Sequence, residues 1–259
     1  MGSDLYKVED ASTRLQTVLH SLGLIVGSFA MGIVLALIAF SFVGAFGISV
    51  DGESTPVWIN VLATVLQFVG FYLVCLWYLQ WRGDSRSLFE FHRPSLRDLG
   101  WVILGFLALI VGVNILSSLV LNFLGVETAT NAVITEGREN PSYFLYLIPI
   151  AFLFNAPAEE LLFRGVVQGL FRNAYGVVPG VVIASVLFGA VHITALFTSG
   201  ASTLSLGVTI AITIILGLVL GALYERTKNL FVPILAHGLY NALLFYIQWL
   251  DATGQISLA

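Results

Sequence analysis

The 259-residue sequence is poor in charge and nearly free of cysteine. Only 10% of its residues are Asp, Glu, Lys or Arg, against about 25% in a typical soluble domain, and 58% are hydrophobic. This composition excludes an ordinary soluble domain and makes lipid the expected surroundings of the chain. Cys75 is the only cysteine, which excludes an internal disulfide and a thiolate metal cluster. No basic block suited to nucleic acid occurs, so we expect no nucleic-acid partner.

Long apolar runs make up most of the chain. They cover about residues 21–48, 57–81, 99–124, 143–171, 178–198, 203–224 and 230–250. Each run is long enough to cross roughly 30 Å of hydrocarbon as a helix. The runs are continuous rather than alternating, which favours helices over a barrel. The sequence therefore predicts an all-α, multi-pass transmembrane bundle with about seven spans, or eight at most.

The seven runs divide into two parts. Residues 1–140 hold the first three spans and a cytosolic loop at 82–98, and residues 141–259 hold the other four. The first run is far longer than the apolar core of a signal peptide, so we expect it to remain as a membrane anchor. The run at 143–171 is unusually long and contains Pro149 and Pro157. The segment 126–141 is polar and predicts a loop.

Basic residues give the orientation. If the N-terminus is cytoplasmic, nine of the eleven Lys and Arg residues lie on the inner side, only Arg138 lies outside, and Arg164 lies within a span. The inner set is Lys7, Arg14, Arg82, Arg86, Arg93, Arg97, Arg172, Arg226 and Lys228. Positive charge concentrates on the cytoplasmic side of membrane proteins. The sequence therefore predicts a cell-membrane protein with its N-terminus inside and its C-terminus outside.

Three charged residues lie deep within one run, namely Glu159, Glu160 and Arg164. A charge at the bilayer centre costs at least about 2.5–3.5 kcal/mol, so such residues usually face the bundle interior and have a function. Glu160 and Arg164 are four residues apart on one helix face and can form a structural pair. Glu159 points about 100° away from Glu160 and is left without that partner. A carboxylate of this kind, with a raised pKa, suits a general base.

Two histidines lie within later runs. At 1.5 Å per residue, Glu159 lies roughly 20 Å, His192 roughly 21 Å and His237 roughly 12 Å from the inner ends of their helices. Asn241 is four residues beyond His237 on the same face, roughly 18 Å deep. Gly189 and Gly238 remove bulk beside each histidine and should let neighbouring helices approach closely. We therefore expect these polar side chains to meet inside the membrane.

This set is equipped to hydrolyse an amide bond. A carboxylate and a histidine can position and deprotonate water, while a second histidine and an amide can stabilise an oxyanion. Glu159, His192 and His237 could instead bind Zn²⁺. We favour the metal-free interpretation, without a cofactor, because no local two-histidine motif is present. Other intramembrane protease types fit poorly, because His-Glu-x-x-His is absent and no run contains an aspartate within it.

Three motifs carry a family resemblance. Glu159-Glu160-x-x-x-Arg164, Phe188-x-x-x-His192 and His237-x-x-x-Asn241 occur in order on successive late runs, and the match spans about Ala151–Leu244. This pattern resembles the CPBP family, which includes type II CAAX prenyl endopeptidases, bacteriocin-processing and immunity proteins, and abortive-infection-like proteins. The resemblance implies a CAAX-protease-type core in residues 141–259.

The resemblance also implies a role for each motif residue. Glu159 and His192 would activate water, His237 and Asn241 would stabilise the oxyanion, and Glu160 would complete the catalytic set. Arg164 and Phe188 would support the site. The expected partner is a membrane-associated peptide or protein substrate, in some family members a prenylated one. The number of subunits in the assembly is not predicted.

Two rival functions stay open on the sequence. Some members of this family act as membrane scaffolds or immunity proteins without proteolysis, and such a protein would keep its partner binding after loss of Glu159. A transporter would use a buried carboxylate to carry protons. The sequence shows no inverted repeat and no paired broken helices, which makes a transporter the weaker alternative.

Overall fold

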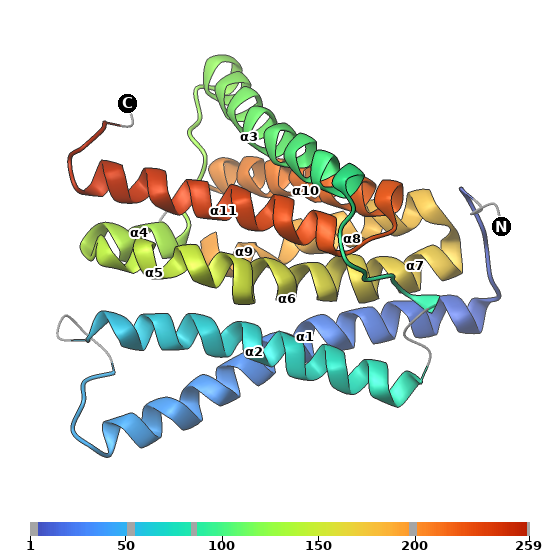
Figure 1. Cartoon of the computed structure of the whole chain (residues 1–259), viewed down its shortest axis with the longest axis horizontal. Coiled ribbons are helices and arrows are strands. Elements are labelled where there is room, and N and C mark those ends of the chain that lie inside the picture. The colour runs from blue at the N-terminus through green and yellow to red at the C-terminus, as the bar shows by residue number, and fades with distance from the viewer. Residues whose placement is uncertain (1–4, 51–54, 84–86, 197–200, 258–259) are drawn as a thin grey trace.

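The computed structural model describes residues 5–50, 55–83, 87–196 and 201–257, and the regular elements among these residues are all helices. Seven spans in this part of the chain are long and apolar enough to cross a membrane, which confirms the all-α multi-pass prediction. They are Ala11–Gly44 (α1), Val57–Arg82 (α2), Leu96–Leu124 (α3), Ser142–Tyr175 (α5 to α7), Val177–Leu196 (α8 and α9), Thr203–Thr227 (α10) and Phe231–Ala252 (α11). Figure 1 shows the start of α1 and the end of α11 at opposite ends of the bundle.

The first helix begins earlier than its apolar run. We predicted a span from about residue 21, whereas α1 begins at Ala11. The Asp10 carboxylate accepts hydrogen bonds from the backbone N–H groups of Ser12 and Thr13 at 2.9 and 3.0 Å and so caps the helix. Hydrogen bonds from the Ser12 side chain and the Thr13 backbone also hold the pKa of Asp10 well below its usual range. A capping signal therefore sets this boundary, and hydropathy alone does not detect it.

The fourth span is a single long helical segment interrupted by two π-helical stretches. It consists of Ser142–Ile150 (α5), Ala151–Asn155 (η2), Ala156–Glu160 (α6), Leu161–Val167 (η3) and Gln168–Tyr175 (α7). Pro157 has no N–H to give to the carbonyl of Leu153, and the Tyr72 hydroxyl of α2 donates to that carbonyl at 3.3 Å instead. π-Helical turns of this kind are frequent at functional sites. Here they flank the segment that carries the two glutamates.

The fourth span is also the central helix of the bundle. In its most apolar window 39% of the residues are buried, against 17 to 33% in the other spans. In Figure 1 it runs between the α1–α2 pair on one side and α11 on the other. Its buried side chains Phe163, Val166 and Phe171 belong to a cluster that also contains Leu24 of α1 and Phe71 of α2. This position surrounds its polar side chains with protein.

The segment 126–141 is not the simple loop that its polarity predicts. It contains the helix Ala132–Glu139 (α4), capped by the Asn131 side chain, which accepts from the backbone N–H of Val133 at 2.9 Å. The Asn60 side chain of α2 donates to Glu136, and Gly137 packs directly against the Phe144 ring. Tertiary contacts thus stabilise a helix too short to form alone. The division of the chain at residue 140 stays a prediction.

Candidate active site

Glu160 forms the buried centre of the site. Its Oε2 lies 3.2 Å from Nε of Arg164, and its Oε1 lies 2.8 Å from Nδ1 of His237. The side chains of Glu160 and Arg164 are 0% and 1% exposed. The pair has the geometry expected from the four-residue spacing, whereas the contact with His237 of α11 was not predicted. One buried carboxylate therefore joins the first and third motifs.

The Arg164 guanidinium is held by two further groups. Its Nη2 donates to the carbonyl of Gly217 in α10 at 3.2 Å. Its Cζ lies 4.2 Å from the centroid of the Phe188 ring, in a cation–π arrangement. Phe188 also stacks edge-on against both histidines, with centroids 4.7 Å from His192 and 6.1 Å from His237. Phe188 thus lies between the cation and the two imidazole rings, which suits the supporting role implied for it.

The partners of His237 define its protonation. Because the Glu160 carboxylate can only accept, Nδ1 of His237 carries the proton. Nε2 then accepts from the Asn241 amide at 3.1 Å. It also lies 3.9 Å from Oε2 of Glu159, beyond direct hydrogen bonding. His237 is therefore hydrogen-bonded to the Glu160 carboxylate and lies close to that of Glu159.

Asn155 connects Glu159 to this network, and sequence reasoning missed it. Its amide nitrogen donates to Oε1 of Glu159 at 3.0 Å, and its amide oxygen accepts from the Asn241 side chain. Glu159 is thus not without a partner, although its partner is an uncharged amide rather than a cation. Asn155 lies four residues before Glu159 and is polar within an apolar run, and that spacing could have identified it.

His192 lies at the end of α8 (Val177–Val191), where the chain turns into α9 (Ile193–Leu196). Its Nδ1 is 2.7 Å from the carbonyl oxygen of Phe188, and a carbonyl only accepts, so Nδ1 is protonated. This leaves Nε2 with a free lone pair, which is the form that a general base needs. No hydrogen bond joins His192 to either glutamate among the described residues. The second motif is therefore linked to the other two only by lining the same cavity, and not by a hydrogen bond to Glu159 or Glu160.

That shared space is a cavity of about 770 Å³. Glu159, His192, His237 and Asn241 all contribute to its lining, together with Asn155. The Glu159 side chain is 14% exposed, in contrast to Glu160 at 0%. The Glu159 carboxylate therefore reaches the cavity, whereas the neighbouring Glu160 carboxylate is buried behind it. The catalytic roles of these residues stay predictions. Their side chains line one cavity, which is the place where water and a peptide would react.

The zinc alternative lacks the geometry that it needs. Throughout the part of the chain that the structure describes, no three His, Cys, Asp or Glu side chains are grouped so that they could hold a metal ion. Glu159, His192 and His237 share the cavity without converging on one point. We therefore derive no chemistry through zinc.

Small residues beside both histidines permit the close packing that the sequence predicts. A Cβ added at Gly189 would lie 2.3 Å from the Ile214 side chain of α10 and 3.1 Å from the Ile214 backbone nitrogen. A Cβ at Gly238 would lie 2.9 Å from the Phe152 ring. These approaches bring α8 against α10 and α11 against the fourth span, and so fix the depth of each histidine.

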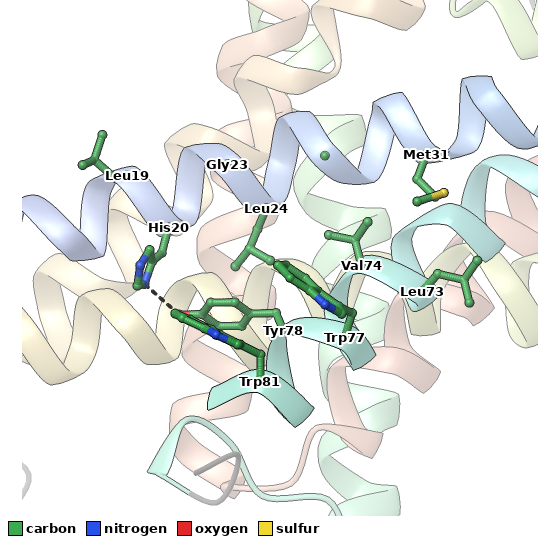
Figure 2. A pocket seen from close by; sticks show the side chains of 11 residues that line it. Leu19, His20, Gly23, Leu24, Met31, Leu73, Val74, Trp77, Tyr78 and Trp81 are labelled. Atoms are coloured by element: carbon green, nitrogen blue, oxygen red, sulfur yellow. Dashed lines mark hydrogen bonds between the residues drawn. The ribbon is translucent and has the colours of Figure 1, made fainter. Parts of the chain in front are cut away.

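A second hollow, of about 780 Å³, lies between α1 and α2 and is not part of this site. Figure 2 shows that its side chains are almost all apolar and that the His20 ring is hydrogen-bonded to the Tyr78 hydroxyl, at 3.1 Å. Trp77 and Trp81 on its rim are 62% and 63% exposed. In a membrane such rings face lipid, and no carboxylate accompanies them, so this hollow lacks the groups for hydrolysis.

The comparison with known families addresses the region that carries the three motifs. Residues 141–243 match the family described as type II CAAX prenyl endopeptidase Rce1-like. This region of the chain is similar to that family. The Rce1-like region contains all seven residues of the motifs and confirms the resemblance that they carry. It begins ten residues before Ala151 and ends one residue before Leu244. No curated protein and no solved structure matches the chain significantly.

Proposed function

We propose that the protein is an intramembrane endopeptidase that hydrolyses a peptide bond in a membrane-associated substrate. One observation carries the proposal: Glu159, His192, His237 and Asn241 line a single cavity within an Rce1-like region. The family description makes a prenylated C-terminal peptide the first substrate to test.

In the proposed reaction, Glu159 and Nε2 of His192 accept hydrogen bonds from one water molecule. The carboxylate takes a proton from this water as its oxygen attacks the substrate carbonyl carbon. The resulting tetrahedral intermediate collapses, the C–N bond breaks, and the same proton passes to the leaving nitrogen. The products are a new carboxyl group and a new amine, so atoms and charge balance without a further reactant.

Stabilising the oxyanion requires the resting hydrogen bonds to exchange. Both N–H bonds of Asn241 are already used, one by Nε2 of His237 and the other by Asn155. A substrate carbonyl oxygen would displace one of these acceptors and receive the N–H in its place. His237 adds a second donor only if Nε2 carries a proton, because Nε2 is the acceptor from Asn241 in the resting arrangement.

A cleavage assay tests the proposal. Purified protein in lipid vesicles is incubated with a prenylated peptide and with the same peptide lacking the lipid, in water enriched in ¹⁸O. Mass spectrometry should show a new C-terminus carrying ¹⁸O, and strong metal chelators should leave the rate unchanged. Failure to cut any of a broad set of membrane-anchored peptides, with partner binding retained in Glu159→Gln, would instead support a scaffold. Loss of activity on chelation would restore the metal alternative.

We also propose that the N-terminus is cytoplasmic and the C-terminus lies outside, because this orientation assigns nine of the eleven basic residues of the sequence to the cytoplasmic segments. A reporter fused after Ala259 that is active only outside the cytoplasm should be active in intact cells. The same reporter fused before Met1 should be silent and serves as the matched control. Activity of the N-terminal fusion alone would reverse the orientation.

A further inference from the structure

The hollow between α1 and α2 begins where these two helices cross. A Cβ added at Gly70 would lie 2.4 Å from the backbone nitrogen of Gly32, so the two backbones are in direct contact at these glycines. The hollow is lined by α1 residues that precede Gly32 and by α2 residues that follow Gly70, where the crossed helices diverge (Figure 1). A Cβ added at Gly23 would have nothing within 4 Å. The divergence therefore leaves an open space of about 780 Å³ between the two helices.

The depth of the hollow is close to that of one leaflet of a bilayer. Its lining on α1 extends from Leu19 to Met31, and the 12 steps from 19 to 31 at 1.5 Å each make about 18 Å. Half of a hydrocarbon core of roughly 30 Å is about 15 Å. The crossing at Gly32 ends the hollow near the middle of the apolar run 21–48. A transmembrane helix needs the full thickness and would extend past the hollow, whereas a lipid acyl chain has the matching length.

One end of the hollow is polar and the other is apolar. Figure 2 shows His20, Tyr78 and Trp81 together at one end, and Met31 and Leu73 at the other. The His20 ring lies edge-on to the rings of both Tyr78 and Trp81, with centroids 5.7 Å apart in each case. Tyrosine and tryptophan, whose rings carry a polar O–H or N–H, favour the membrane–water interface. The hollow thus has the polarity of a lipid molecule, with a headgroup end and a chain end.

The polar end is complementary to an anionic headgroup. Arg82 is the last residue of α2, and its guanidinium interacts with the Tyr78 hydroxyl. The Arg82 guanidinium and the Trp81 indole donate hydrogen bonds and accept none. As far as the structure describes the chain, the lining contains no Asp or Glu. Basic residues beside a membrane attract anionic lipids, and hydrogen bonds from a guanidinium to a phosphate are strong.

We propose that this hollow binds an anionic phospholipid, whose phosphate lies beside Arg82 and whose acyl chain lies along Gly23 and Gly27. The hollow shares no lining residue with the cavity of Glu159, so its occupant is a component of the membrane rather than the substrate of the proposed cleavage. The bound chain packs against both helices in the space that their divergence leaves open. It thus joins α1 to α2 beyond their crossing and stabilises the folded form that binds it.

Native mass spectrometry of the full-length protein tests this proposal without requiring proteolysis. The protein is stripped of lipid in a mild detergent and titrated with phosphatidylglycerol or with phosphatidylcholine of the same acyl chains. The fraction that carries one lipid gives each Kd. The wild type should bind phosphatidylglycerol about fivefold more tightly, which is the preference that one arginine near the headgroup supplies. Arg82→Gln should remove this preference, whereas Arg97→Gln, at the exposed start of α3, should keep it.

A second variant tests the place of the acyl chain. Gly23→Leu puts a side chain into the open space and should weaken the binding of both lipids at least about tenfold, because each excluded CH₂ group contributes to affinity. Gly207→Leu is the matched control, since a Cβ there also has nothing within 4 Å but lies in α10. Equal affinity of the wild type for the two lipids, or unchanged binding in Gly23→Leu, would overturn the proposal. A wild-type dimer that Gly23→Leu dissociates would also overturn it and assign the hollow to a second copy of the chain.

Discussion

Purified Glu159→Gln protein should lose about 100- to 10,000-fold of its cleavage rate while keeping its fold. Glutamine has the same shape as glutamate, and its amide oxygen can still accept from Asn155, which now donates to Glu159 at 3.0 Å. It cannot take a proton from water, however. The loss should therefore appear in kcat, with little change in KM, because substrate binding does not depend on that proton.

The control for this change is Glu139→Gln. Glu139 ends α4, is exposed to solvent and does not line the cavity. This variant should cleave at the wild-type rate. Rates are measured on the same vesicle-bound peptide, and the thermal unfolding midpoint of each variant is recorded beside them. If Glu159→Gln keeps more than a tenth of the activity, Glu159 is not the general base, and His192 is the next residue to test for that role.

Glu160→Ala should lower the stability of the folded protein as well as the cleavage rate. The change leaves the Arg164 guanidinium, which is 1% exposed, without its carboxylate and frees Nδ1 of His237. Breaking one partner of a buried ion pair costs about 3–5 kcal/mol. We expect the midpoint of thermal unfolding in detergent to fall by roughly 10 °C.

Two further variants separate this mechanism from a general intolerance of substitution. In the double variant Glu160→Leu, Arg164→Met, neither buried charge remains, so most of the lost stability should return while cleavage stays absent. Glu9→Ala serves as the control, because it breaks an exposed ion pair. The side chains of Lys7 and Glu9 are 43% and 36% exposed, so the midpoint of thermal unfolding should change very little. Equal midpoints for Glu160→Ala and the wild type would show that the Glu160 carboxylate does not stabilise the fold.

The sequence predicts best those features that depend on hydropathy or on residue spacing within one helix. The seven spans follow from continuous apolar runs, and the Glu160–Arg164 geometry follows from a four-residue spacing. The contact between Glu160 and His237 could not be predicted, because it joins residues 77 positions apart through the packing of α11. Hydropathy also gave no indication of α4, which its tertiary contacts stabilise.

The depth estimates describe backbone positions, whereas the contacts are made by side chains. They separate Glu159 and His237 by roughly 8 Å along the membrane normal. The two side chains nevertheless approach to 3.9 Å. The estimate assumes untilted helices with a uniform rise per residue, and the fourth span has two π-helical stretches, η2 and η3, where that rise is not uniform. Asn155 is a different case, because its four-residue spacing from Glu159 could have identified it from the sequence.

The buried pair of Glu160 and Arg164 also has an electrical consequence. A unit charge that crosses the full transmembrane field changes its energy by about 2.3 kcal/mol per 100 mV. The two charges of the pair are opposite, and Oε2 of Glu160 lies 3.2 Å from Nε of Arg164, so together they carry no net charge into the bilayer. The membrane potential therefore exerts almost no net force on the pair, and the position of the fourth span does not depend on the voltage through it.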